Sequence, residues 1–144
     1  MKKNLFLLVS VLVCLLSLSS CGGAKEQSET EEPEVKRSDV ELAADAYYGL
    51  LADGDFKAAV QSTYDYNKEM TEEEQEDMNA MLDMTADKLK EAMKEKEGIK
   101  DYAFSNEVVD GKRATIDVKI TYGNGEEEVK TETLMKVEDN WFIK

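Results

Sequence analysis

The spacing of apolar residues changes once along this 144-residue chain, and the change constrains the fold more than any other feature. Between residues 38 and 97, apolar side chains recur every three or four positions, which is the period of amphipathic helices. From Ile99 onward, apolar and polar residues alternate, as they do in strands that bury only one face. Helices followed by a run of strands are typical of an α+β domain.

Capping signals divide the helical part into three predicted helices, at about 38–53, 55–64 and 71–97. Ser38 and Thr71 are each followed three residues later by a glutamate, which is the capping-box spacing. A Gly-Asp pair separates the first two helices, because glycine favours a helix end and aspartate caps the next start.

The predicted third helix has acidic residues in its first turns and lysines near its end. This order complements the helix dipole, so the acidic run has a structural explanation and need not be a metal site. Four methionines lie between Met70 and Met84. They are either an adaptable binding face or, as is commoner, a packed core stripe.

Four strands follow, joined by turns at Asp110-Gly111, at residues 123–125 and at residues 138–140. The clearest strand is 114–122, where five apolar residues face one way and polar residues face the other. We expect an antiparallel four-stranded meander with the three helices packed on one face. The apolar members of the predicted strands are Tyr102, Phe104, Val108, Ala114, Ile116, Val118, Ile120, Tyr122, Val129, Met135, Val137, Trp141, Phe142 and Ile143.

The first twenty residues have the form of a secretory signal, with a basic start and an apolar run over 5–18. Fourteen residues are too few to span a bilayer as a helix, which takes about 20. Residues 18–21, Leu-Ser-Ser-Cys, resemble the lipobox of bacterial lipoproteins. The resemblance implies cleavage before Cys21 and acylation of that cysteine, for example with palmitate. The alternative is an ordinary signal peptide with a chance cysteine at its end.

The segment from Cys21 to Arg37 is acidic, contains the only proline, and has one large apolar residue. Such a composition favours a flexible tether over a packed element. We therefore expect a signal peptide at 1–20, a lipidated cysteine with an acidic tether at 21–37, and one domain at 38–144. The protein should be lipid-anchored in the bacterial cell envelope, at the outer membrane. The acids of the tether resemble a surface-export signal of some lineages, so a periplasmic and a surface-exposed location both stay open.

Composition excludes several classes of function. The chain has no histidine, the usual general base and the commonest metal ligand. Its two cysteines are Cys14 and Cys21, so no thiol is available to the folded part. With a formal net charge of −14, the chain should repel nucleic-acid phosphates. We expect no catalytic residue, metal, cofactor or nucleic-acid partner.

The lipobox, the Gly54-Asp55 break, the meander and the last strand with Trp141 together resemble bacterial lipoproteins of the nuclear-transport-factor-2-like, or cystatin-like, superfamily. The resemblance covers 38–144, and Asn140 departs from it where glycine is common. It implies a strongly curved sheet that wraps the long helix and can leave a conical pocket. Ketosteroid isomerase-like members carry out acid–base chemistry in such a pocket, and many others bind ligands or partners, so the fold alone assigns no activity.

The leading functional expectation is a non-catalytic binding module for a small molecule, a glycan or an envelope protein, held at the membrane by its lipid. Tyr102, Phe104, Tyr122 and Trp141 are the candidate ligand-binding residues, because aromatic side chains commonly line ligand pockets. The alternative for each of them is the core between sheet and helices.

Two other functions stay open. An acid–base enzyme would need a carboxylate facing a phenol in a dry pocket. Asp117 is a poor candidate because alternation places it on the polar face, and Asp101 beside Tyr102 is only slightly better. A third possibility is that the acidic surface binds a cation such as calcium.

Overall fold

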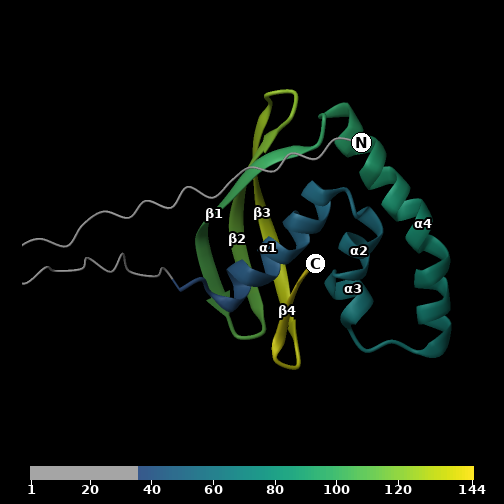
Figure 1. The fold of residues 1–144 in the computed structure, drawn as a ribbon. Helices are drawn as coiled ribbons and strands as arrows, with labels where there is room; N and C mark the ends of the chain where they lie inside the picture. Colours follow the sequence, from purple (N-terminus) through teal and green to yellow (C-terminus); the bar gives the residue numbers. More distant parts are fainter. Residues whose placement is uncertain (1–35) are drawn as a thin grey trace, which may run out of the picture. The chain divides into compact units, whose positions relative to one another are not determined.

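The computed structural model describes residues 36–144, so the predicted signal peptide, Cys21 and nearly all of the tether lie outside the described residues. The described chain forms helices and then strands, as the change of period predicts (Figure 1). In order, the elements are α1 (Asp39–Asp53), α2 (Phe56–Gln61), α3 (Tyr64–Asn67), α4 (Glu72–Glu95), β1 (Ile99–Asp110), β2 (Arg113–Tyr122), β3 (Glu127–Val137) and β4 (Asn140–Ile143).

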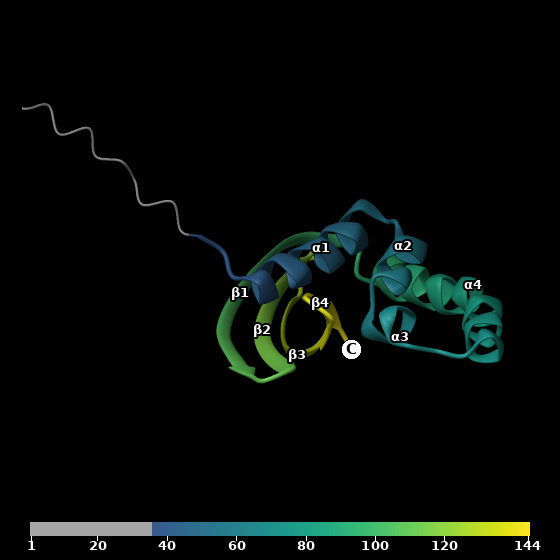
Figure 2. The same ribbon diagram turned by 90° about the horizontal axis from the view of Figure 1, so that it is seen from below.

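The four strands form one antiparallel sheet in the order β1-β2-β3-β4, which confirms the predicted meander and the α+β class. The sheet curls, and α1 lies within the curl (Figure 2). We call the side of the sheet that faces α1 its inner face. Helix α1 packs against β1, β2 and β4, whereas α3 packs against β3 and β4.

The core lies between α1 and the inner face. Strand β2 supplies its alternate residues to this core, as predicted, and its other residues face outward. Helix α1 supplies four side chains at helical spacing, and Leu134 and Ile143 complete the far side. The largest fully buried side chains are Tyr48, Tyr122, Ile116, Ile120, Leu134 and Val118.

The expectation of three helices is wrong in one detail, because two short helices, α2 and α3, stand where the second helix was predicted. Helix α2 ends at Gln61, and the next two hydroxyls turn back onto the backbone. Ser62 Oγ donates to the carbonyl of Ala59, and Thr63 Oγ1 donates to the carbonyl of Val60, each at 2.8 Å. Such local bonds compete with helix propagation. Thr63 then stands at the N-cap of the single-turn helix α3.

The expectation that all the helices pack on the sheet is also wrong. The long helix α4 packs chiefly against α2 and forms an outer layer (Figure 2), and the sheet curls around α1. Only Leu82 and Ala86 of α4 are buried. The apolar stripe of α4 is therefore too narrow to need a second packed surface, and most of the helix faces solvent.

Two details of β1 differ from the predicted pattern. Asp110 pairs with Arg113, so the two-residue turn is Gly111-Lys112, one position later than predicted. A register shift lies between Ser105 and Val108, where Asn106 has a φ of 54°. An extra residue in a strand reverses the faces beyond it, so Val108 is 61% exposed.

Strand β3 carries charged residues on its inner face. Glu128, Lys130 and Glu132 pair with inward-facing apolar residues of β2, while Val129 points outward and is 66% exposed. Strand β4 pairs only with residues 134–137, so the first half of β3 is an edge of the sheet. Inward-pointing charges at an edge discourage pairing with another strand.

Candidate functional site

An apolar groove runs along α4 where it faces the shorter helices. Its volume is about 270 Å³. We call it the α4 groove. Its lining residues from α4 are Met78, Met81, Leu82, Thr85 and Leu89, and those of the opposite wall are Tyr47, Val60, Thr63, Asp65 and Tyr66.

The α4 groove bears on whether the methionines of this region form an adaptable binding face or a packed core stripe. Met78 and Met81 line the groove, and Met81 is 52% exposed. Met84 is 49% exposed, so it is not a core residue either. The buried residues of α4 are instead Leu82 and Ala86. Met78 and Met81 therefore form an accessible, flexible part of the groove wall rather than a packed core stripe.

Hydrogen bonds fix the position of α4 along the groove. Tyr66 Oη donates to the carbonyl of Met78 at 2.6 Å, which joins α3 to α4. At the start of α4, Thr71 Oγ1 accepts from the Glu74 amide and the Glu74 carboxylate accepts from the Thr71 amide, which confirms the predicted capping box. These bonds to Glu74 lower the pKa of its carboxyl, the Thr71 backbone bond most.

Exposed ion pairs lie on the short helices and on α4, and one of their residues, Asp65, also lines the groove. Lys68 Nζ lies 3.0 Å from Asp65 Oδ1, and Lys57 Nζ lies 2.7 Å from Asp83 Oδ1. The hydrogen bonds of these pairs raise the pKa of each lysine. Exposed pairs of this kind contribute little to stability and are screened by salt, so a charged partner can replace them.

Two of the predicted ligand-binding residues lie together in an aromatic cluster at the inner face. The ring centroids of Tyr102 and Phe104 are 5.5 Å apart, and both rings contact Tyr48 from α1, at 5.6 and 6.2 Å. Tyr47 lies edge-on to Tyr48 at 5.5 Å. Both predicted residues are half-buried, so they serve mainly to pack α1 on β1.

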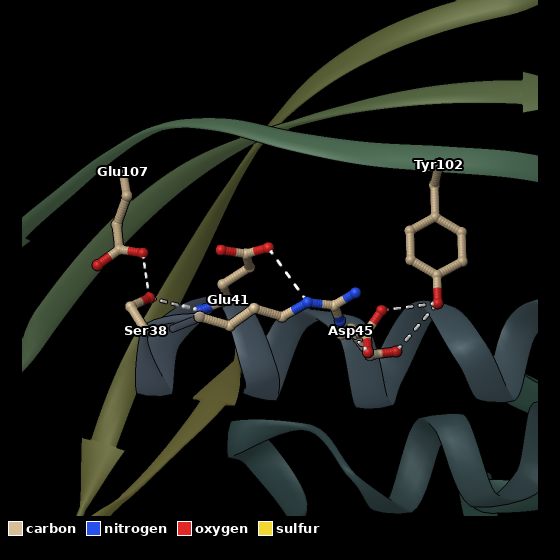
Figure 3. Close-up of polar contacts among 6 residues, drawn as sticks. Ser38, Glu41, Asp45, Tyr102 and Glu107 are labelled. Carbon is tan, nitrogen blue, oxygen red and sulfur yellow. Dashed lines mark hydrogen bonds and ion pairs between the residues drawn. The ribbon is translucent and has the colours of Figure 1, made fainter. Parts of the chain in front are cut away.

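A polar network also joins α1 to β1 (Figure 3). Tyr102 Oη donates to Asp45 Oδ1 at 3.0 Å, and Arg37 Nη1 donates to Asp45 Oδ2 at 2.8 Å. Ser38, the N-cap of α1, donates from its hydroxyl to the Glu107 carboxylate. Burial, followed by the bond to Asp45, raises the pKa of Tyr102. Each group has a partner within the network, which indicates a structural role.

Tyr122 is buried at the C-terminal end of β2 and does not join the cluster. Its hydroxyl donates to Glu128 Oε2 at 2.8 Å, and Lys96 Nζ contacts the same oxygen at 2.8 Å. The lysine also lies 4.1 Å from the centre of the Tyr122 ring. Burial is the main reason that the pKa of Tyr122 is raised, whereas the Lys96 bond is the main reason that the pKa of Glu128 is lowered.

Trp141, the fourth predicted residue, lines a separate cleft of about 470 Å³ between α1 and β4. Leu42 and Phe142 line the same cleft, with Asp39 and Asp139 at its edge. Lys136 Nζ lies 5.7 Å from the centre of the Trp141 ring. The structure therefore places the four predicted residues in three locations rather than in one site.

A pair that the sequence analysis missed is Tyr48 and Glu132. Tyr48 is only 2% exposed, and its hydroxyl donates to Glu132 Oε1 at 2.6 Å. Burial, reinforced by the bond to Glu132, raises the pKa of Tyr48 well above its usual value. Tyr48 follows from the helical period, but nothing local in the sequence indicates which face of β3 turns inward.

The carboxylates weighed in the sequence analysis lie elsewhere. Asp117 is on the outer face, as predicted, and accepts hydrogen bonds from Thr131 at 2.6 Å and Asn106 at 2.9 Å. These bonds lower its pKa, the Thr131 bond most. Asp101 is exposed on β1. Among residues 36–144, no group of three or more acidic, histidine or cysteine side chains could hold a metal ion.

A protein family matches this arrangement over most of the chain. Residues 23–144 match the family described as Domain of unknown function (DUF4878). The chain belongs to the DUF4878 family. The match begins two residues after Cys21 and covers all of the elements described above.

Two solved structures are similar to this DUF4878 chain. A Campylobacter jejuni protein named as an NTF2-like transpeptidase superimposes with a TM-score of 0.59 and 19% identity, over 74% of this chain and 97% of that one. A SEC-C motif containing protein from Rhodopseudomonas palustris gives a TM-score of 0.49 and 20% identity, over 75% of this chain and 78% of that one. No curated protein matches the chain. The first likeness supports the nuclear-transport-factor-2-like fold that the sequence predicts.

In the part that the structure describes, every helix is too short or too polar to cross a membrane. The expected lipid on Cys21 lies outside that part.

Proposed function

We propose that the chain is a lipid-anchored binding module of the bacterial cell envelope, and that it holds an apolar group of its ligand in the α4 groove. The observation that carries the proposal is the groove itself. Its lining is mainly apolar, with few polar side chains, which is the usual composition of a binding site. The module holds its ligand without carrying out chemistry on it.

The construction of α4 supports this role. The helix buries only two side chains, so much of its surface along the groove stays accessible. Met78 and Met81 have flexible side chains that adjust to the shape of a ligand. A groove with one adaptable wall suits binding better than catalysis, which needs groups held in fixed positions.

Anchoring at the outer membrane through Cys21 is the other half of the proposal. Its support is the basic start, the short apolar run and the small residues before Cys21. The family match begins at residue 23, so the proposed cleavage site falls just outside the matched domain. Acyl chains contribute about 0.8 kcal/mol per buried CH₂, so several chains would hold the domain permanently at the membrane.

An acid–base enzyme is the second candidate, and the Tyr48–Glu132 pair is the observation that favours it. The pair has the phenol and the carboxylate that such chemistry uses. Its geometry favours a structural role, because Tyr48 is buried and its hydroxyl already donates to Glu132, so the phenol is not exposed to a substrate. The α4 groove and the Trp141 cleft are lined by other residues. We therefore prefer the binding role.

Methionine methyl groups provide a direct test of the groove. The mature chain, carrying Cys21→Ser so that no lipid is present, is labelled with ¹³C at its methionine methyls and titrated with 1-octanol as an apolar probe. We expect the NMR signals of Met78 and Met81 to move, while that of Met135, on β3, stays in place. Met81→Gln should weaken the response. Equal movement of all the methyls, or none, would show that the groove is not the binding site.

A further inference from the structure

We infer that the occupant of the α4 groove is a short, basic, amphipathic helix of a protein partner. The inference rests on the proposed function, which assigns an apolar group to this groove. It adds the class of the partner from three properties of the groove: the spacing of its wall, its volume and the charge around it.

The spacing of the wall matches a helix. The groove residues of α4 recur at intervals of three, one, three and four positions between Met78 and Leu89. These intervals define a continuous seam along one side of a helix. At 1.5 Å per residue the seam is about 16 Å long, or about three turns. A second helix lying along it would insert side chains spaced three and four residues apart, as in helix-in-groove recognition.

The volume of the groove favours side chains over a whole small molecule. At about 270 Å³ it lies below the range of about 300–1,000 Å³ that is typical of small-molecule sites. Met81, one of its lining residues, is 52% exposed, so the groove is accessible to solvent along this side chain. A protruding apolar side chain can fill such a space while the rest of its helix stays outside. Thioether side chains suit this kind of contact because they repack around different shapes.

The charge around the groove specifies a basic partner. Asp65 lines the groove, and residues 65–87, which include most of α3 and of α4, contain nine acidic residues and one lysine. Asp65 and Asp83 of this segment already bind lysines of the chain itself, in exposed pairs that a partner could replace. Complementary charge steers a partner and selects its orientation. Lysines or arginines beside an apolar stripe on the partner meet this requirement.

Three synthetic helical peptides test the inference against the unlipidated mature chain. The first has leucines at helical spacing and lysines elsewhere, the second replaces the lysines with glutamates, and the third keeps the lysines but scrambles the leucines. Affinity is measured by calorimetry, and the site is identified by the NMR signals of Met78 and Met81. We expect the first peptide to bind at least about tenfold more tightly than either of the others, and to weaken as salt is added.

Matched variants locate the contact. Met81→Glu places a charge in the groove and should abolish binding of the basic leucine peptide. Val129→Glu makes the same change on the outer face of β3, outside the groove, and should leave binding unchanged. Both positions are more than half exposed, so neither glutamate should disturb the core. Asp77→Asn, next to Met78 on α4, should weaken binding several-fold, whereas Asp101→Asn on β1 should not. Circular dichroism checks that each variant is folded.

The outcomes separate the inference from the proposed function. If 1-octanol moves Met78 and Met81 but the basic peptide binds no more tightly than the acidic one, the inference is wrong and the groove still binds apolar groups. If the peptide binds Met81→Glu as well as the parent chain, the attraction is general and the inference is wrong. If neither the probe nor the peptide reaches the groove, both proposals fail.

Discussion

Tyr48 explains how a charged residue can lie on the inner face of the sheet. Glu132 points inward beside the apolar residues of β2, where a carboxylate without a partner would be costly. The Tyr48 hydroxyl supplies the bond, and Tyr122 does the same for Glu128. The phenols thereby allow β3 to carry inward charges at a free edge without destabilising the core.

The pH dependence of stability should report the Tyr48 bond. In the unfolded chain a tyrosine ionises near pH 10, whereas burial raises the pKa of Tyr48 in the folded protein. As the pH rises, Tyr48 therefore loses its proton at a lower pH in the unfolded chain than in the folded protein. The free energy of unfolding falls as the pH rises above about 10. Tyr48→Phe should reduce this fall, and at neutral pH it should cost about 0.5–1.5 kcal/mol for the lost bond.

Urea unfolding followed between neutral and alkaline pH measures both effects of the Tyr48 change. The fall should be reduced and not abolished, since burial also raises the pKa of Tyr47, Tyr66, Tyr102 and Tyr122. An alkaline loss of stability as large in Tyr48→Phe as in the parent chain would contradict the assignment.

At the scale of elements, two glycines differ in whether the structure has room for a side chain. Gly49 lies inside α1, and a Cβ placed there would meet Tyr102 Oη at an ordinary 3.6 Å. Gly123 lies in the β2–β3 turn, and a Cβ there would be 2.2 Å from the carbonyl oxygen of Glu97. The Gly123 amide also donates to the carbonyl of Gly98 at 2.9 Å, so the turn is held close to the end of α4.

Alanine at these two positions should change stability in opposite directions. Gly49→Ala should stabilise the protein by about 0.5–1 kcal/mol, because alanine is the better helix former. Gly123→Ala should destabilise it by at least about 1 kcal/mol, because a backbone carbonyl must move. Urea unfolding of the two variants at neutral pH is the measurement. Changes of the same sign would contradict the packing described for the β2–β3 turn.

The sequence predicted most elements from local signals and failed where long-range contacts decide. Ser38, Asp55 and Thr71 cap helices as predicted, and Gly54 ends α1 in the left-handed conformation. Helix α3 was missed because Thr63 and Tyr64 continue the helical spacing, while the hydroxyls of Ser62 and Thr63 interrupt the helix. The reversal at Asn106 was missed because alternation gives no sign of an extra residue.

At the scale of the molecule, acidity and the proposed lipid act together. The chain has 32 acidic residues against 18 basic ones, and two of the basic ones, Lys2 and Lys3, lie in the proposed signal. Such a domain gains solubility and is repelled by an anionic membrane surface. The proposed anchor at Cys21 would therefore be the attachment that keeps the domain in the envelope, with its α4 groove available to partners.

Substitution of Cys21 tests the anchor. Cys21→Ser should remove palmitate labelling and should release the protein or leave its precursor uncleaved, because the sulfur that takes the lipid is gone. Cys14→Ser, a matched change inside the apolar run, should leave labelling intact. Metabolic labelling with palmitate and fractionation of membranes measure both effects. A Cys21→Ser protein that still carries label would contradict lipidation at this position.

The candidate site, like the fold, could be predicted from the sequence only where neighbouring residues decide it. The sequence named four aromatic residues as one possible site, and the structure distributes them over the α1–β1 cluster, the core and the Trp141 cleft. The α4 groove and the Tyr48–Glu132 pair could not be predicted, since each joins residues distant in the chain.

By itself, the sequence determined the order of helices and strands, the antiparallel meander and the buried face of β2, because hydrophobic period and capping act over a few residues. The tertiary structure alone decided that the sheet curls around α1, that α4 forms an outer layer, and which face of β3 turns inward. These features depend on how separate apolar faces share one core. The narrow apolar stripe of α4 could pack either on the sheet or on α2, and only the tertiary structure shows that it packs on α2.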